Sequence, residues 1–271
     1  MKLKILLVWV LFAMVNILYA DEIEDVVHDM LNPPNPSKSS ITDINKNDLD
    51  MMSMVENRRN DPEGPMVLKY KNGKKAQEIY NKRGSLKLRM YNKKGILVYE
   101  MMKNSKEPDV AKMEFYQSDG SKKMSIQMKS EIFRDMDTMN NRNITSFEKL
   151  NLDLTTNVKY YTKNSQLLYT LDMNKIKNKF KGTRKNYLNG IFSNYIEAEG
   201  NIEPIGKPDQ ITKLRGEMIG KVFSATGKSK GHFTYKGTSL EGIINMYDQH
   251  GNYKGKRNYN FKEFSKKINP D

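Results

Sequence analysis

The hydrophobic pattern of the chain changes at Met66, where apolar and polar residues begin to alternate with a period of two. The alternation is clearest in residues 85–90, 123–128 and 167–173, and it recurs in residues 150–154. Because successive side chains of a β-strand point to opposite faces of a sheet, this period predicts strands with one buried face. The chain is therefore predicted to be mainly β.

A short motif separates these strands: an aromatic residue, three further residues and a glycine. It occurs at residues 80–84, 91–95, 116–120, 223–227 and 247–251, and a version one residue shorter ends at Gly73. Glycine reaches positive φ at the least cost, so a type I turn followed by a left-handed glycine is predicted, for example at residues 80–84. The predicted turn glycines are Gly73, Gly84, Gly95, Gly120, Gly227 and Gly251.

The first three of these glycines are spaced by 11 residues, which fits one strand of about seven residues and one turn. Successive strands are therefore predicted to pair as an antiparallel meander of repeated hairpins. Residues 66–130 carry the regular repeats. Residues 147–271 carry degenerate ones and end in a basic tail. Between them, residues 131–146 break the pattern and are interpreted as a loop, an insertion or a boundary between two sheets.

Three degenerate copies of the turn motif lie in the middle of the chain. Serine replaces the glycine at residues 161–165, residues 187–190 are one residue short, and residues 195–200 are one residue long. The register of the hairpin array is therefore predicted to be irregular in this region.

The strand–turn–strand unit of 22 residues, best seen in residues 70–101, resembles the variant MORN repeat of the YwqK-type antitoxin-component family. Residues 235–251, with their spaced tyrosines and glycines, are similar to the ordinary MORN motif. The resemblance implies an elongated, single-layer antiparallel sheet whose hairpins stack on their neighbours. It also implies a binding or scaffolding module and not an enzyme.

Residues 1–20 are predicted to be a secretory signal peptide. Lys2 and Lys4 precede an apolar run over residues 5–18, and Ala20 is the small residue expected at a cleavage site. The alternative is an uncleaved N-terminal anchor. The protein is thus predicted to be exported, with a bacterial-type location in the periplasm or at the cell surface.

Residues 21–65 are predicted to hold short helices and a disordered linker. Apolar residues at helical spacing predict a first helix in residues 21–31, and a second is predicted in residues 48–57. Prolines and serines are frequent between and after these helices, so residues 32–65 are expected to be partly disordered.

The chain contains no cysteine and carries a formal net charge of +14. The first fact excludes disulfides, zinc–thiolate sites and iron–sulfur clusters. The second favours an anionic envelope component as partner, which could be a lipid headgroup, an acidic glycan or an acidic protein. Nucleic acid is not the expected partner, and the oligomeric state is open. The alternative is that the charge only keeps a β-sheet soluble.

One basic cluster stands out as a candidate anion-binding site. Its members are Lys175, Lys177, Lys179, Lys181, Arg184 and Lys185. In a single strand, the alternating cations are predicted to share one face, with Tyr187 and Tyr195 nearby as stacking surfaces. The alternative is a solvated face, or an edge strand that lysines protect from unwanted pairing.

No catalytic residue, metal site or cofactor is predicted. The three histidines are His28, His232 and His250, of which only the last two could approach each other through adjacent hairpins. No nucleophile motif is present. The leading hypothesis is an exported, non-catalytic binding or scaffolding protein of the cell envelope. The alternative is a periplasmic lipid or lipoprotein carrier, which would differ by leaving the apolar face of its sheet open.

Overall fold

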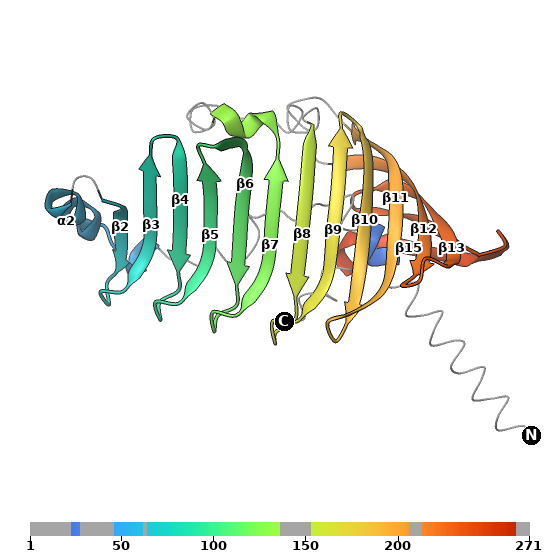
Figure 1. Cartoon of the computed structure of the whole chain (residues 1–271), viewed down its shortest axis with the longest axis horizontal. Helices are drawn as coiled ribbons and strands as arrows, with labels where there is room; N and C mark the ends of the chain where they lie inside the picture. The colour runs from blue at the N-terminus through green and yellow to red at the C-terminus, as the bar shows by residue number, and fades with distance from the viewer. Residues whose placement is uncertain (1–22, 28–45, 62–63, 136–152, 206–212, 264–271) are drawn as a thin grey trace, which may run out of the picture.

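A computed structural model describes residues 23–27, 46–61, 64–135, 153–205 and 213–263 (Figure 1). All of its strands belong to one 15-stranded sheet, in which their spatial order is their sequence order. Every neighbouring pair is antiparallel. The predicted antiparallel meander is therefore confirmed.

The first seven strands are β1 (Leu49–Asp50), β2 (Met66–Tyr70), β3 (Lys75–Lys82), β4 (Ser85–Tyr91), β5 (Leu97–Asn104), β6 (Glu107–Tyr116) and β7 (Lys122–Lys129). The others are β8 (Leu154–Tyr161), β9 (Leu167–Ile176), β10 (Lys179–Leu188), β11 (Ile191–Ile205), β12 (Lys213–Ser224), β13 (Ser229–Thr238), β14 (Glu241–Asp248) and β15 (Tyr253–Asn260). The named helices are η3 (Lys46–Asp48), α2 (Met52–Asn60) and η4 (Glu131–Asp135). Residues 23–27 are also helical.

The sheet has one apolar face, which we call the inner face, and one polar face, the outer face. Direct register partners build a continuous apolar row on the inner face across β4 to β9. Its members are Leu88, Met101, Met113, Ile126, Val158 and Leu171. The last four of them are at most 3% exposed. The alternation along each strand thus places the core on one side of the whole sheet.

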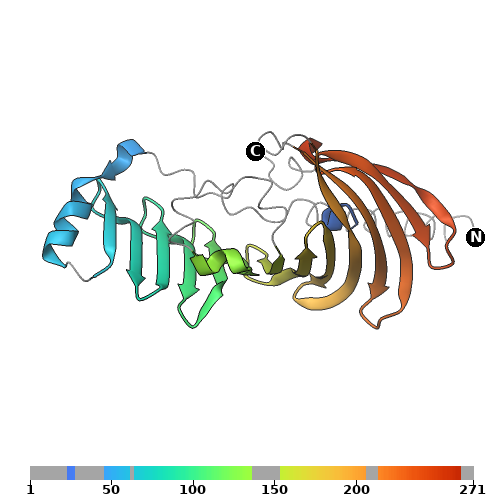
Figure 2. The same ribbon diagram turned by 90° about the horizontal axis from the view of Figure 1, so that it is seen from above.

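The sheet is nearly flat at its N-terminal end and curls from β10 to β15 (Figure 2). The helical residues 23–27 lie in the concavity of this curled half, against the inner face. Ile23, Val26 and Val27 are 2%, 0% and 0% exposed. A segment from the start of the chain therefore fills the core of the C-terminal half.

Glycines on the inner face make room for the large rings of the curled half. Phe180 pairs with Gly200, and Phe233 pairs with Gly220. A Cβ on Gly220 would stand 2.1 Å from the Phe233 ring, and one on Gly200 would stand 2.9 Å from the Phe180 ring. Each ring lies over a bare stretch of backbone, which is how aromatic side chains compensate strand glycines.

One kind of turn recurs along one end of the sheet. The amide of its positive-φ residue donates to the carbonyl three residues earlier. The donor–acceptor pairs are Gly73–Tyr70, Gly95–Asn92, Gly120–Gln117, Ser165–Thr162, Gly227–Ser224 and Gly251–Asp248. The φ angle lies between 80° and 89° at the five glycines and is 61° at Ser165. These are the bulged hairpin loops that the motif predicts.

Two of the predicted turns have another structure. Gly84 belongs to a two-residue turn at the opposite end of the sheet, where Lys82 pairs directly with Ser85 and both Arg83 and Gly84 have positive φ. Residues 195–200 form no turn, because they lie inside β11. There, the missing side chain of Gly200 leaves room for the Phe180 ring on β10. A glycine after an aromatic residue therefore does not by itself distinguish a turn from a crowded strand.

The interruption after residue 130 does not divide the sheet, because β7 pairs with β8 from Met124–Tyr160 to Lys129–Thr155. Of the predicted loop, residues 131–135 form η4. Residues 136–146, like Leu150 and Leu152, lie outside the described residues. One sheet thus spans both groups of repeats.

The second predicted helix is shifted along the chain. It was expected over residues 48–57, but α2 spans Met52–Asn60, and Leu49 and Asp50 instead pair with β2. The Asp50 carboxylate accepts the amide protons of Met52 and Ser53, so the helix begins after it. Both β1 and α2 contact β2.

The predicted signal peptide, most of the linker and the end of the basic tail lie outside the described residues. None of the helices in the described part of the chain has the length and apolar character to span a membrane.

Candidate binding site on the outer face

The inner face of the curled half is closed by the chain itself. Besides its three buried apolar side chains, the segment 23–27 forms two ion pairs with the sheet. Arg184 Nη2 donates to Asp25 Oδ2 over 3.1 Å, and Arg257 Nη1 donates to Glu24 Oε2 over 3.4 Å. The side chains facing this concavity therefore bind the N-terminal segment.

Arg184 is enclosed on several sides. Its side chain is 7% exposed, its Nε donates to Asn186 Oδ1 over 2.9 Å, and its guanidinium carbon lies 4.0 Å from the centre of the Tyr169 ring. Asn186 in turn donates to Asn194 over 2.8 Å. These contacts satisfy a buried cation, so Arg184 belongs to the core network and not to an anion-binding surface.

The six predicted anion-binding residues do not share one face. β9 ends at Ile176, and Lys177 lies in the turn with φ 52°. Lys175, at 8% exposure, therefore faces inward with Arg184, and burial lowers its pKa in spite of the nearby Asp153. Lys179, Lys181 and Lys185 alternate along β10 on the outer face and are exposed. The prediction of a single ridge was wrong because the chain reverses in the middle of the cluster.

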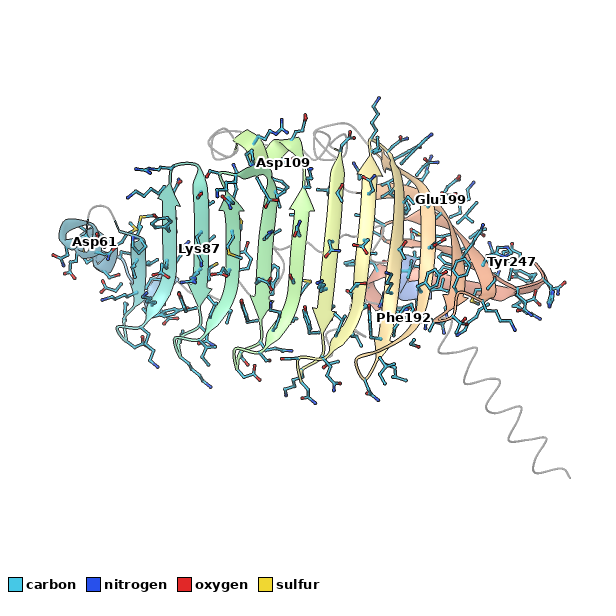
Figure 3. All side chains as sticks on the ribbon, in the orientation of Figure 1. Asp61, Lys87, Asp109, Phe192, Glu199 and Tyr247 are labelled. Atoms are coloured by element: carbon cyan, nitrogen blue, oxygen red, sulfur yellow. The ribbon has the colours of Figure 1, made fainter. Side chains whose placement is uncertain are left out.

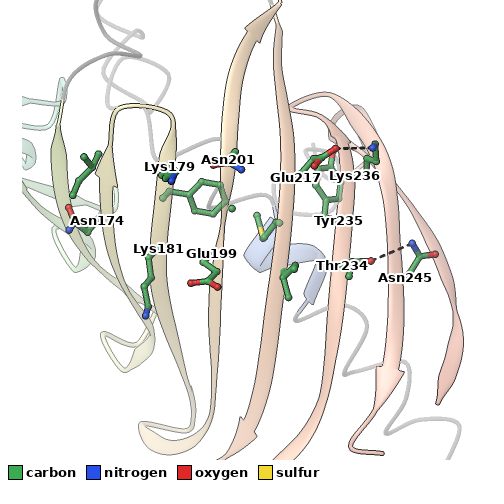
Figure 4. A pocket seen from close by; sticks show the side chains of 15 residues that line it. Asn174, Lys179, Lys181, Glu199, Asn201, Glu217, Thr234, Tyr235, Lys236 and Asn245 are labelled. Carbon is green, nitrogen blue, oxygen red and sulfur yellow. Dashed lines mark hydrogen bonds and ion pairs between the residues drawn. The ribbon is translucent and has the colours of Figure 1, made fainter. Parts of the chain in front are cut away.

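A hollow of about 870 Å³ lies on the outer face over β9 to β14 (Figure 4). The polar side chains of its lining are Asn174, Lys179, Lys181, Glu199, Asn201, Glu217, Thr234, Lys236 and Asn245. Ile176 and Ile219 add apolar surface and are 54% and 55% exposed. The hollow thus brings together two of the predicted lysines with side chains from six consecutive strands.

Some of the lining groups hold one another in place. Lys236 Nζ lies 2.8 Å from Glu217 Oε1, and Asn245 Nδ2 donates to Thr234 Oγ1 over 3.5 Å (Figure 4). Hydrogen bonding to Lys236 lowers the pKa of Glu217. Among the described residues, none forms an ion pair with Lys179 or Lys181. The lining thus holds two such lysines on β10 and the carboxylate of Glu199, which is the register partner of Lys181 on β11.

The outer face of the N-terminal half has a different electrostatic character, because its charges pair across strands (Figure 3). Arg89 lies between Glu78 and Glu100, at 3.5 Å and 2.6 Å, and Lys87 lies 3.1 Å from Glu100. Burial alone would raise the pKa of Glu100, but hydrogen bonds from Arg89 and Lys87 outweigh it and lower the pKa. Positive and negative side chains therefore neutralise one another across β3, β4 and β5, and we call this set, Glu78, Lys87, Arg89 and Glu100, the charge ladder.

An aromatic row follows the turn-bearing end of the outer face. Tyr187 and Phe192 have ring centres 5.8 Å apart, Phe192 and Tyr195 are 6.4 Å apart, and Tyr195 and Phe223 are 4.7 Å apart at 13°. Tyr187 and Tyr195 were predicted as stacking surfaces for a ligand. In the structure the Tyr195 ring stacks on Phe223, whereas the Tyr187 ring is tilted by 52° against Phe192.

The two described histidines do not converge. His232 stacks on Tyr247 with ring centres 4.6 Å apart, whereas His250 Nε2 lies 3.0 Å from the Gln249 side chain in a turn. His28 lies outside the described residues. In the described part of the chain, no three His, Asp or Glu side chains gather as metal ligands.

Several lining residues of the hollow escaped prediction from sequence. Asn174, Asn201, Thr234 and Asn245 stand on four different strands, and each is an ordinary polar residue in an alternating pattern. That alternation could have assigned them to the polar face. Their mutual proximity depends on strand register, which has no local signal.

In comparisons with known proteins, no family model and no curated protein matches this chain.

Proposed function

We propose that the protein is an exported, non-catalytic binding module of the cell envelope that holds a polar, anionic ligand in the outer-face hollow. The observation that carries this proposal is the composition of the hollow. Lys236 pairs with Glu217, and Lys179 and Lys181 together outweigh the one further carboxylate, Glu199, beside the amide and hydroxyl groups of the lining. Such convergent polar groups fix the orientation of a ligand.

The ligand class that fits this lining best is an acidic glycan. Sugar hydroxyls exchange hydrogen bonds with the amides of Asn174, Asn201 and Asn245, and carboxylates bind the lysines. Ile176 and Ile219 offer apolar patches to the C–H faces of the sugar rings. The hollow is open and extends over several strands, which suits a chain better than a small compact molecule.

The alternative, a lipid or lipoprotein carrier, requires an open apolar face. In the curled half that face is occupied by residues 23–27, and Ile196 and Phe233 are each 0% exposed. A closed inner face supports a module that binds through its outer face. Copurified lipid in native mass spectrometry of the exported protein would favour the carrier instead.

The test is affinity electrophoresis of the exported protein through gels that contain polygalacturonate, with neutral dextran as the comparison polymer. We expect retardation by polygalacturonate alone, weakening as salt is raised. The double variant Lys179→Gln/Lys181→Gln should bind about threefold to tenfold more weakly.

Lys159→Gln/Lys221→Gln is the matched control, because both are exposed lysines of the same face outside the lining of the hollow and their replacement removes the same two charges. Retention that falls equally in the hollow variant and in this control would mean that net charge alone binds the polymer, and it would reject the hollow as the site.

A further inference from the structure

The β10–β11 hairpin ends in an exposed apolar tip. Leu188 and Ile191 pair across the turn and are 70% and 73% exposed, the highest values among the large apolar side chains of the described residues. Tyr187 and Phe192 form the next pair and are half-buried. The tip therefore presents two aliphatic side chains to solvent in front of two aromatic rings.

Hairpin formation does not require these aliphatic residues. The turn is made by Asn189 and Gly190, whose φ angles are 53° and 79°, and this two-residue turn is specified by the Asn-Gly pair alone. The neighbouring turns at the same end are longer loops with polar tips, such as residues 162–166 and 224–228. Two neighbouring aliphatic side chains with this much exposure at one hairpin tip are typical of an interaction site.

The surroundings of the tip are basic and free of acids. Residues 161–168, 185–195 and 223–232 form the ends of three adjacent hairpins and contain no Asp or Glu. Lys163, Lys185 and Lys228 are exposed there. The hairpins on either side of these three bring Asp119, which interacts electrostatically with Lys163, and Asp248, which pairs with Lys254 at 3.0 Å.

We propose that the β10–β11 tip inserts into the surface of an anionic lipid membrane. Leu188 and Ile191 enter the boundary between headgroups and acyl chains, and the Tyr187 and Phe192 rings lie at headgroup level, where aromatic side chains are favoured. The three lysines bind the anionic headgroups around them. Apolar insertion and basic flanks together are the combination by which peripheral proteins bind such surfaces.

This membrane contact is independent of the hollow, whose lining residues are different ones. A protein docked by its tip would keep the outer-face hollow available for a ligand. Loss of vesicle binding with retained polygalacturonate binding would therefore come from the tip alone, and the reverse result from the hollow alone.

The test is cosedimentation of the exported protein with vesicles of phosphatidylcholine alone or with 30% phosphatidylglycerol (about one lipid in three). The wild type should sediment with the anionic vesicles only. Leu188→Ser/Ile191→Ser should lower the partition coefficient by about tenfold or more. Lys185→Gln/Lys228→Gln should also weaken binding. High salt should remove the difference between this lysine variant and the wild type.

Ile243→Ser is the matched control, because Ile243 is 44% exposed on the outer face of β14, away from the tip. Its partition should equal that of the wild type. Failure of the wild type to sediment, or equal binding by the tip variant, overturns the proposal; the second result would mean that charge alone attracts the protein.

A fluorescent reporter measures insertion directly. The only tryptophan of the chain is Trp9, inside the predicted signal peptide, so Ile191→Trp in the processed protein introduces a single reporter at the tip. Mass spectrometry first verifies processing. We expect its emission to move to shorter wavelength with anionic vesicles. An unchanged spectrum on vesicles that do sediment the protein shows a surface-bound tip and rejects insertion.

Discussion

Asp25 and Arg184 are 159 positions apart in the chain and meet inside the curl of the sheet, where Arg184 Nη2 donates to Asp25 Oδ2 over 3.1 Å. This ion pair fixes the segment that immediately follows the predicted signal peptide. The hydrophobic core of the C-terminal half is therefore complete only when the start of the chain has docked against the sheet.

Replacing Asp25 with Asn should lower the free energy of unfolding by about 1–2 kcal/mol, because it removes the ion pair between Asp25 and the largely buried Arg184 guanidinium. The estimate is below that for a fully buried pair, since the Asp25 side chain is 38% exposed. Urea unfolding measures it.

Glu24→Gln is the matched control, since the partner Arg257 is 31% exposed and keeps access to water. We expect a smaller loss for Glu24→Gln than for Asp25→Asn. Equal losses would contradict the special role of the Arg184 contact.

Replacing Gly220 with Ala should destabilise the curled half by about 1–3 kcal/mol. The new Cβ would stand 2.1 Å from the Phe233 ring, which is 0% exposed and would have to shift within the core. Thermal unfolding measures the loss. The double variant Gly220→Ala/Phe233→Leu should recover part of the stability, whereas no recovery would show that backbone strain is the cause.

Replacing Ser165 with Gly should stabilise the protein by about 0.5–1 kcal/mol. Ser165 takes the position that glycine holds in the other loops of this kind, with φ 61°, and a left-handed conformation costs a side-chain-bearing residue about 1–2 kcal/mol. The added flexibility of the unfolded chain offsets part of the gain. Gly95→Ala, the opposite change in another loop of this kind, should destabilise. A stabilising Gly95→Ala would refute this account.

Acid should weaken the N-terminal half through its charge ladder. Hydrogen bonds from basic partners lower the pKa of Glu78 and Glu100 below the ordinary carboxyl value, in spite of their burial. Their ionised forms therefore stabilise the fold above the unfolded-state pKa of about 4.3, and this contribution is lost as the pH falls through the folded-state values.

We expect the melting temperature to fall between about pH 5 and pH 3, and the fall to be smaller in Glu100→Gln. Scanning calorimetry over this range is the measurement, and Glu199→Gln on the outer face controls for the loss of one carboxylate. A Glu100→Gln protein with the full acid sensitivity of the wild type would refute the assignment to the ladder.

Much of the fold could be predicted because it has local causes. The alternation around Leu88 and around Ile126 indicates a strand with one buried face. Gly95 and Gly251 each indicate a loop that needs a residue with positive φ. These signals act within a few residues, and a meander pairs each strand with the next. Strand order therefore followed from the hairpins without any long-range information.

The candidate site depended on relations that no short stretch of sequence contains. The turn at Lys177 separates Lys175 from Lys179 and places them on opposite faces, so Lys175 is buried whereas the lysines of β10 are exposed. Gly200 resembles a turn glycine one residue out of spacing, but it lies inside β11, where a Cβ would stand 2.1 Å from the Glu217 carbonyl oxygen and 2.9 Å from the Phe180 ring.

The alternation along the chain was sufficient to predict the strands, the hairpins and the single apolar face of the sheet, because each of these features depends on the backbone geometry of adjacent residues. The tertiary structure determined the curvature of β10 to β15, the closure of the inner face of these strands by residues 23–27 and the hollow over six strands. Those features depend on strand register and on contacts between residues that are distant in the chain. Asp25 and Arg184 are such a pair, and only the folded sheet brings them together.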